Sequence, residues 1–182
     1  MILIPMKFAD SNLISAISSE IKRIFGWNII VSGYIDAPTE YFDRSRRQYI
    51  SEGILGMASR ISSERRDIVL IIADLDAYAD DLNFVFGQAE LNGLAAVVYL
   101  GRLRPEFYGE KEDYSLFTRR VLKEVMHELG HVMGLGHCRN WRCVMYFSNT
   151  IADTDRKGNY DSYYCNRCSD MIRRSIPRKI VK

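Results

Sequence analysis

The sequence predicts an α/β domain built on a mixed, mostly parallel sheet of about five strands, with one antiparallel strand at its edge. Two observations predict this fold class. Strand-like and helix-like segments alternate through the first half of the chain, which is typical of parallel strands joined by helices. The last two strand-like segments are separated by a link too short for a helical crossover, so they should pair antiparallel. With 182 residues, positions 1–182 are expected to form a single domain.

Apolar and β-branched content predicts the early strands, and apolar residues at 3.6-residue spacing predict the early helices. These segments are a strand at Met1–Met6, a helix capped by Asp10 or Ser11 and ended by Gly26, a strand at Asn28–Ile35, and a helix over Arg46–Ser62. Asp67–Ala73 is apolar on both faces, which is typical of a central strand of a parallel sheet.

Two further strands complete the predicted sheet. Ala95–Leu100 is apolar throughout and is expected to be buried. Phe84–Glu90 alternates more and contains Gly87, which favours an edge strand with a bulge. Only Leu91–Leu94 joins the two segments, which gives the antiparallel pairing. Such an edge strand could hold an extended peptide by main-chain pairing.

The second half of the chain is dominated by one helix. Its predicted span is Ser115–Met133, with a continuous apolar stripe, and glycines follow it. The segment from Cys138 to about Tyr160 is expected to be irregular, and a short helix should cover Tyr163–Ser175. The basic tail Arg173–Lys182 is expected to be a solvated end, and a binding arm is its alternative.

Composition excludes several functional classes. Hydrophobic residues make up 47% of the chain and charged residues 26%, which is ordinary for a globular protein. A net charge of +2 is too small to indicate a nucleic-acid or membrane partner. The longest apolar run, Leu94–Leu100, is far shorter than the ~18 residues that a membrane helix needs. The start of the chain lacks the basic region of a signal peptide, so we expect a cytoplasmic protein.

The central motif is His127-Glu128-Leu129-Gly130-His131, followed by His137. His127 and His131 are four residues apart, so on a helix their imidazoles share one face and can bind one ion. Gly134 allows the chain to leave the helix, after which His137 can return as a third ligand. Three neutral nitrogen ligands leave one tetrahedral position open, as in a catalytic zinc site.

Glu128 is placed beside the first histidine, where it can reach a water on the metal without being a ligand. It is therefore the candidate general base for zinc-dependent hydrolysis of peptide bonds. The motif by itself also fits an exposed helix face. A zinc-binding or peptide-binding protein of the same fold that hydrolyses nothing is the competing function. The presence of Glu128 favours hydrolysis, because metal binding alone does not require it.

All four cysteines of the chain fall near these histidines: Cys138, Cys143, Cys165 and Cys168. Two cysteine pairs about twenty residues apart are a common spacing for a structural zinc with four thiolate ligands. Two disulfides and four free thiols are the alternatives, and a reducing compartment argues against the first. A zinc ion here would tie the segment after the long helix to the C-terminal helix.

Within Glu124–Cys168 the chain resembles a known family. HELGHVMGLGH is similar to the metzincin signature HExxHxxGxxH, and the following CRNWRCVM and CNRC resemble those of the archaemetzincins. The resemblance implies a zinc metalloprotease with a metzincin-like fold and two Zn²⁺ ions per chain. It makes His127, His131 and His137 catalytic zinc ligands and Glu128 the general base. It makes the four cysteines ligands of a structural zinc.

The same resemblance assigns Met145 to the Met-turn, the methionine that packs beneath the catalytic zinc. Taken alone, Met145 would be an ordinary core residue. The partner implied is a peptide or protein substrate, and we expect a monomer that binds neither nucleic acid nor membrane.

Overall fold

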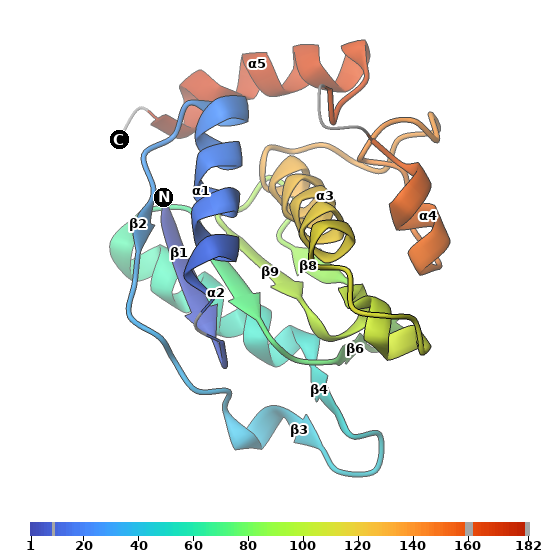
Figure 1. Cartoon of the computed structure of the whole chain (residues 1–182). Coiled ribbons are helices and arrows are strands. Elements are labelled where there is room, and N and C mark those ends of the chain that lie inside the picture. The colour runs from blue at the N-terminus through green and yellow to red at the C-terminus, as the bar shows by residue number, and fades with distance from the viewer. Residues whose placement is uncertain (9, 159–161, 181–182) are drawn as a thin grey trace.

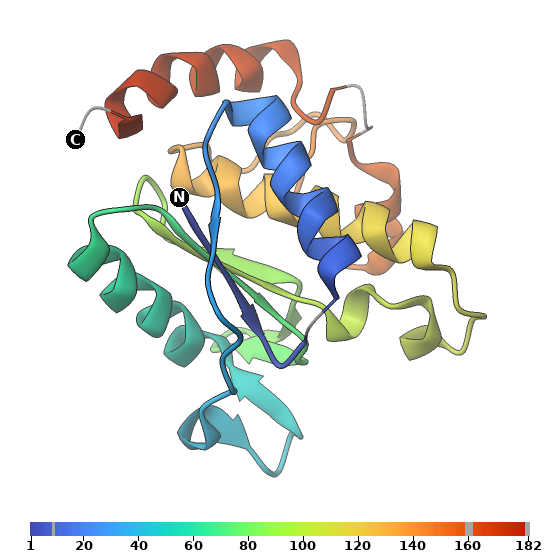
Figure 2. The same ribbon diagram turned by 60° about the vertical axis from the view of Figure 1, so that its left-hand side comes forward.

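The computed structural model describes residues 1–8, 10–158 and 162–180, with side chains described as far as Ser175 (Figure 1). Most of the basic tail therefore lies outside the described side chains, and its predicted role stays untested. A five-stranded sheet forms the middle layer. Helix α2 (Ser51–Arg65) covers one face, and helices α1 (Ser11–Phe25) and α3 (Tyr114–Val132) cover the other (Figure 2). None of the described helices is both long and apolar enough to cross a bilayer.

The order of the main sheet is β2-β1-β5-β9-β8. Its strands are β1 (Ile2–Met6), β2 (Ile30–Val31), β5 (Val69–Ala73), β8 (Gly87–Ala89) and β9 (Ala95–Tyr99). All pair in parallel except β8, which lies antiparallel to β9 at the edge. Both β5 and β9 are buried along their whole length because helices cover both faces. The predicted mixed sheet with an antiparallel edge strand is confirmed.

The opposite edge of the sheet is shorter than the sequence predicts. Of Asn28–Ile35, only Ile30–Val31 forms a strand, and Ile35 makes an isolated bridge to Met6. Proline accounts for the gap. The carbonyls of Leu3 and Pro5 both face this edge, but Pro5 has no N–H to donate across it. The ladder therefore breaks after its first two pairs.

The predicted strand Phe84–Glu90 is divided between two sheets. Its first part belongs to β7 (Leu82–Val85), which pairs with β6 (Ala77–Ala79) in a small second sheet. Its second part is β8, and the buried side chain of Phe86 marks the change. The second sheet has the order β3-β4-β6-β7, with β3 at Phe42–Asp43 and β4 at Gln48–Ile50. Side chains alternate in both sheets, so the sequence pattern did not reveal the switch.

The helices follow their expected positions with shifted ends. Asp10 caps α1 by accepting from two backbone N–H groups, and Gly26 ends it with φ of 72°. Helix α2 starts five residues later than predicted, because β4 occupies the preceding residues. Helix α5 covers Asn166–Ile180 rather than Tyr163–Ser175. The segment expected to be irregular contains α4 (Ile151–Arg156), whose start is a capping box.

Candidate active site

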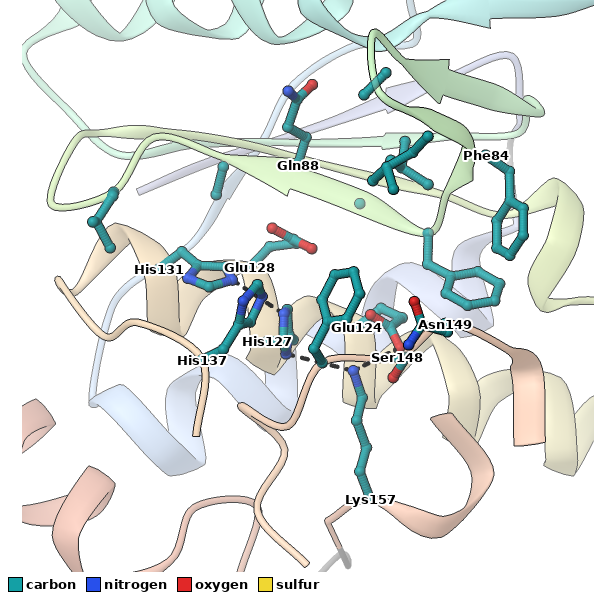
Figure 3. A pocket seen from close by; sticks show the side chains of 18 of the residues that line it. Phe84, Gln88, Glu124, His127, Glu128, His131, His137, Ser148, Asn149 and Lys157 are labelled. Atoms are coloured by element: carbon teal, nitrogen blue, oxygen red, sulfur yellow. Dashed lines mark hydrogen bonds and ion pairs between the residues drawn. The ribbon is translucent and has the colours of Figure 1, made fainter. Parts of the chain in front are cut away.

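A cleft of about 580 Å³ lies between the edge strands β7 and β8 and the helix α3 (Figure 3). Its other walls come from the chain that follows α3 and from Lys157, just after α4. Four polar residues of α3 face this side, namely Glu124, His127, Glu128 and His131. Their spacing of three and four residues places them on one stripe of the helix. The opposite stripe of α3 packs in the core, so the amphipathic pattern that forms the helix also aims these side chains.

The three histidines converge in this cleft. The Nε2 atoms of His127 and His131 lie 3.1 Å apart. The chain turns at Gly134, with φ of 90°, and brings back His137, whose ring centroid lies 4.9 Å from that of His131. One ring nitrogen from each histidine lies within 4.8 Å of the other two. Tetrahedral zinc with nitrogen ligands at about 2.0–2.1 Å places those nitrogens about 3.3 Å apart, so the donor set fits zinc.

Backbone carbonyls fix the orientation of two of these rings. His127 Nδ1 lies 2.7 Å from the Val144 carbonyl oxygen, and His131 Nδ1 lies 2.8 Å from that of Leu135. When Nδ1–H donates to a carbonyl, the lone pair is left on Nε2, which is the atom that points toward the other rings. Burial lowers the pKa of both imidazoles, with further lowering by nearby cationic groups. The rings are therefore held neutral, as metal ligands must be.

Glu128 is buried beside the histidines, with 3% of its surface exposed. Burial raises its pKa well above the usual range, repulsion from Glu124 adds to this, and Lys157 opposes it. Its Oε2 has no hydrogen-bond partner among the described residues. Its carboxyl lies against the backbone of β8: a Cβ placed on Gly87 would be 2.6 Å from Oε1. Gly87 is thus the point where the edge strand approaches the carboxyl most closely.

The edge strand β8 presents main-chain groups to the cleft. Tyr99 N–H donates to the Phe86 carbonyl, and Glu90 N–H donates to the Ala95 carbonyl. In an antiparallel ladder these inward-facing residues alternate with outward-facing ones. Gly87 and Ala89 therefore direct their N–H and C=O groups away from β9, on the free edge. An extended chain laid along this edge would find donors and acceptors at two-residue spacing.

Met145 packs against α3 at Gly130. It is fully buried, and a Cβ on Gly130 would overlap its Sδ atom. Glycine between Glu128 and His131 is therefore what lets this methionine approach the helix. Tyr164 packs at the same place, and its hydroxyl donates to the Met126 carbonyl at 2.6 Å.

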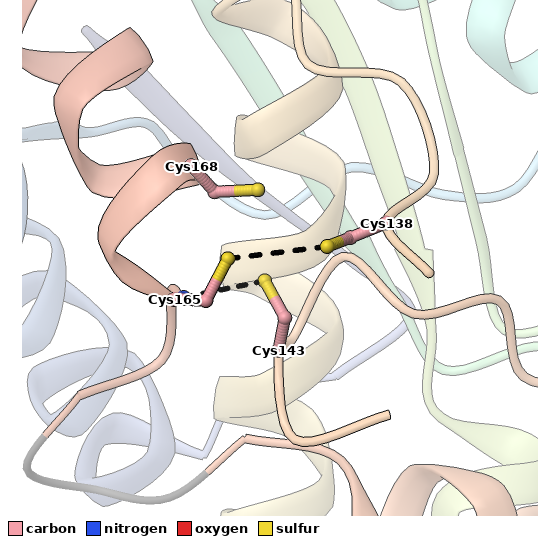
Figure 4. A group of neighbouring side chains, drawn as sticks. All are labelled: Cys138, Cys143, Cys165 and Cys168. Carbon is pink, nitrogen blue, oxygen red and sulfur yellow. Dashed lines mark hydrogen bonds between the residues drawn. The ribbon is translucent and has the colours of Figure 1, made fainter. Parts of the chain in front are cut away.

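The four cysteines form a second cluster of possible metal ligands (Figure 4). All four are free thiols, and their sulfur atoms lie within 4.8 Å of one another. Cys138 and Cys165 Sγ are 3.9 Å apart, too far for a disulfide at ~2.05 Å and close to the spacing of thiolates around one zinc. Backbone N–H groups of Asn140 and Cys165 donate to Sγ atoms of the cluster.

One short loop joins the two clusters. Cys138 directly follows His137, and its N–H donates to the Met145 carbonyl at 2.8 Å. Val144, whose carbonyl orients His127, lies between Cys143 and Met145. All the residues that the motifs singled out are thus brought together as two groups, one of histidines with Glu128 and one of cysteines.

Sequence reasoning missed several residues that line the cleft. Glu124 carried a signal, since it lies one turn before His127 on the same face of α3. Lys157, Ser148 and Asn149 carried none, because only the tertiary fold brings the chain around α4 back to the cleft.

The profile of "Peptidase family M54" matches residues 11–174 of the chain. The chain belongs to this family, the archaemetzincins. Archaemetzincin from Methanocaldococcus jannaschii is 43% identical over 164 residues, which is 90% of this chain and 87% of that protein. Archaemetzincin from Pyrococcus furiosus is 38% identical over 187 residues, which covers 100% of this chain and 96% of that protein.

Solved archaemetzincins share the fold. The crystal structure from Archaeoglobus fulgidus, complexed with malonate, has a TM-score of 0.79 at 36% identity, covering 93% of this chain and 98% of that one. The crystal structure of archaemetzincin from Methanopyrus kandleri has a TM-score of 0.80 at 31% identity, and the match covers 97% of this chain and 95% of that one. Membership of this peptidase family makes the chain a zinc metallopeptidase that acts on peptide substrates, in agreement with the function expected from the motifs.

Proposed function

We propose that His127, His131 and His137 hold the catalytic zinc and that Glu128 is the general base for peptide-bond hydrolysis. The observation that carries this proposal is the orientation of the rings. Both Nδ1 atoms on α3 face carbonyl oxygens, which leaves Nε2 atoms 3.1 Å apart and aimed at a common point. The Glu128 carboxyl lies in the same cleft with one oxygen unpartnered among the described residues.

Zinc, when bound, lowers the pKa of a coordinated water toward about 7 and polarises a carbonyl oxygen. Glu128 would accept a proton from the attacking water and pass it to the leaving amine. Its buried position raises the pKa of the carboxyl and suits it to carry that proton between the two steps. The free edge of β8 would hold the substrate backbone through the main-chain groups of Gly87 and Ala89.

We also assign a second, structural zinc to Cys138, Cys143, Cys165 and Cys168. Four sulfur atoms around one point are the usual donor set of a closed zinc site. Met145 is assigned to the Met-turn from its packing against Gly130. We propose that residues 1–182 form one metzincin-like domain that works as a monomer in the cytoplasm, where four thiols stay reduced.

Glu128→Gln tests the assignment of the base. The amide is nearly isosteric but accepts no proton, so kcat should fall by about 10²–10⁴ with KM little changed. Peptide cleavage by the zinc-loaded protein is the measurement, and the exposed Glu64→Gln is the matched control. Undiminished cleavage in Glu128→Gln would assign the base elsewhere. Elemental analysis should give two zinc ions per chain, and a single ion would refute the structural site.

A further inference from the structure

A buried ion pair lies in the wall of the cleft. Lys157 Nζ is 3.0 Å from Glu124 Oε1, and the two side chains are 1% and 3% exposed. Thr154 Oγ1 donates to the same Oε1 at 2.8 Å. Both charged residues line the cleft beside the histidines (Figure 3). Burying two charges costs several kcal/mol per ion before their attraction offsets it, so stability alone is a weak reason for this pair.

The pair leaves hydrogen-bonding capacity unused. Lys157 has three N–H donors, and Glu124 is its one acceptor among the described residues. His127 Nδ1 lies 3.4 Å away, but it donates its own hydrogen to Val144 and offers no lone pair. Thr154 Oγ1 and Lys157 Nζ both contact Oε1 of Glu124, and none of the described residues donates a hydrogen bond to its Oε2. An acceptor and donors thus lie side by side within the cleft wall.

Ser148 adds a third polar group to this wall. Its Oγ is buried and has no hydrogen-bond partner among the residues that the structure describes. Ser148 and Asn149 line the cleft on the chain that follows Met145. A buried hydroxyl without a partner is costly unless a ligand completes it.

The charges favour a neutral polar ligand. Lys157 and Glu124 have opposite formal charges, and Glu128 is the one other acidic side chain among the residues that line the cleft. A carboxylate entering here would be repelled by Glu124, and an ammonium by Lys157. An apolar side chain would leave the unused donors and acceptors buried without partners. A carboxamide can donate to Glu124 and accept from Lys157 at once.

We infer that Lys157, Glu124 and Ser148 form a specificity subsite for the carboxamide side chain of an asparagine or glutamine next to the scissile bond. This inference rests on the proposed function, because it places the substrate beside the three histidines. It names a substrate class for the peptidase: peptides with an amide side chain at one of the two positions flanking the cleaved bond.

Phosphinic peptides test the subsite without turnover. In these compounds a phosphinate replaces the scissile amide, and glutamine, glutamate, lysine or norleucine can be placed at either neighbouring position. Calorimetry with the zinc-loaded protein should show, at one position, glutamine bound roughly 10–100-fold more tightly than the other three. Tighter binding of norleucine, glutamate or lysine at both positions would overturn the inference.

Two variants should move the preference in opposite directions. Glu124→Gln leaves Lys157 without its counter-charge and should shift the preference toward glutamate. Lys157→Met leaves Glu124 unpaired and should shift it toward lysine. Asp155→Asn is the matched control, because this carboxylate pairs with the buried Arg120 outside the cleft and should leave the ranking unchanged. An identical ranking in all four proteins, each with full zinc content, would refute the subsite.

Cleavage of the corresponding peptides separates this inference from the proposed function. Binding that ranks glutamine first while no peptide is cleaved would support the subsite and count against hydrolysis. Zinc-dependent cleavage without any preference for glutamine would support hydrolysis and refute the subsite.

Discussion

Substitution of Gly87 by alanine tests whether the edge strand positions the Glu128 carboxyl. A Cβ at residue 87 would lie 2.6 Å from Glu128 Oε1 and 2.7 Å from its Cγ. Ordinary contact begins at 3.4 Å, so the carboxyl must move by at least about 0.8 Å. Because these atoms belong to a flexible side chain, the backbone of β8 can stay in place. The expected cost in stability is about 1–3 kcal/mol, as for a modest overpacking.

The effect on catalysis should be much larger than this. A displacement of about 1 Å in a catalytic group can cost on the order of 100-fold in rate. We expect kcat of Gly87→Ala to fall by roughly that factor, with KM and zinc content close to those of the parent. Steady-state cleavage of a peptide substrate at saturating zinc is the assay. Gly56→Ala is the control, since no atom lies within 4 Å of its added Cβ.

A double substitution identifies the cause. Glu128→Ala removes the Cγ, Cδ and Oε1 atoms that overlap the new Cβ. This substitution should therefore lower kcat by a smaller factor in Gly87→Ala than in the parent, since the effects of substitutions at contacting residues are not additive. Additive losses, or an unchanged kcat in Gly87→Ala, would refute a positioning role for Gly87.

Other predictions concern the metals, the strand edge and pH. Replacing Cys165 and Cys168 by serine should remove one zinc and lower stability by several kcal/mol, whereas His131→Ala should remove the other with the fold retained, as measured by elemental analysis and thermal unfolding. Ala89→Pro removes an outward N–H and should weaken phosphinic-peptide binding without loss of circular dichroism. In metal-free protein, Glu128 keeps its proton above the ordinary pKa of 4.5 while the unfolded chain loses it, so stability falls as pH rises beyond 4.5. Glu128→Gln lacks this loss and should melt higher than the parent at pH 7 but not at pH 4.

Periodicity predicted the layers of this fold because the buried strands and helices carry the pattern along their full length. Strands β5 and β9 are apolar on both faces, and α3 has a continuous apolar stripe. The small sheet escaped prediction because its strands are two to four residues long, shorter than any reliable pattern. The sequence of Asn28–Ile35 also does not predict that the strand there stops after Val31, because the cause is Pro5 in the neighbouring strand β1.

The residues of the candidate site also divide into those that the sequence predicts and those that it does not. The histidines, Glu128 and the cysteines are close in sequence, so their spacing on one helix and in one loop predicts their convergence. Lys157 and Ser148 reach the cleft only through the packing of α4 against α3. At Gly87 the sequence predicts only an edge-strand bulge, because the contact with Glu128 depends on a side chain about forty residues away. Residues that act through long-range contacts leave no local pattern to detect.

The loop from His137 to Met145 belongs to both side-chain clusters, and this has a thermodynamic consequence if each cluster holds an ion. Any order that the thiolates impose on the loop also improves the placement of His137 and of the carbonyl that orients His127. Reciprocity then requires that occupation of the histidines raise the affinity of the thiolates by the same factor. As zinc becomes scarce, individual molecules of the protein would tend to carry both ions or neither. Hydrolytic capacity would then follow the zinc supply more steeply than a single independent site allows.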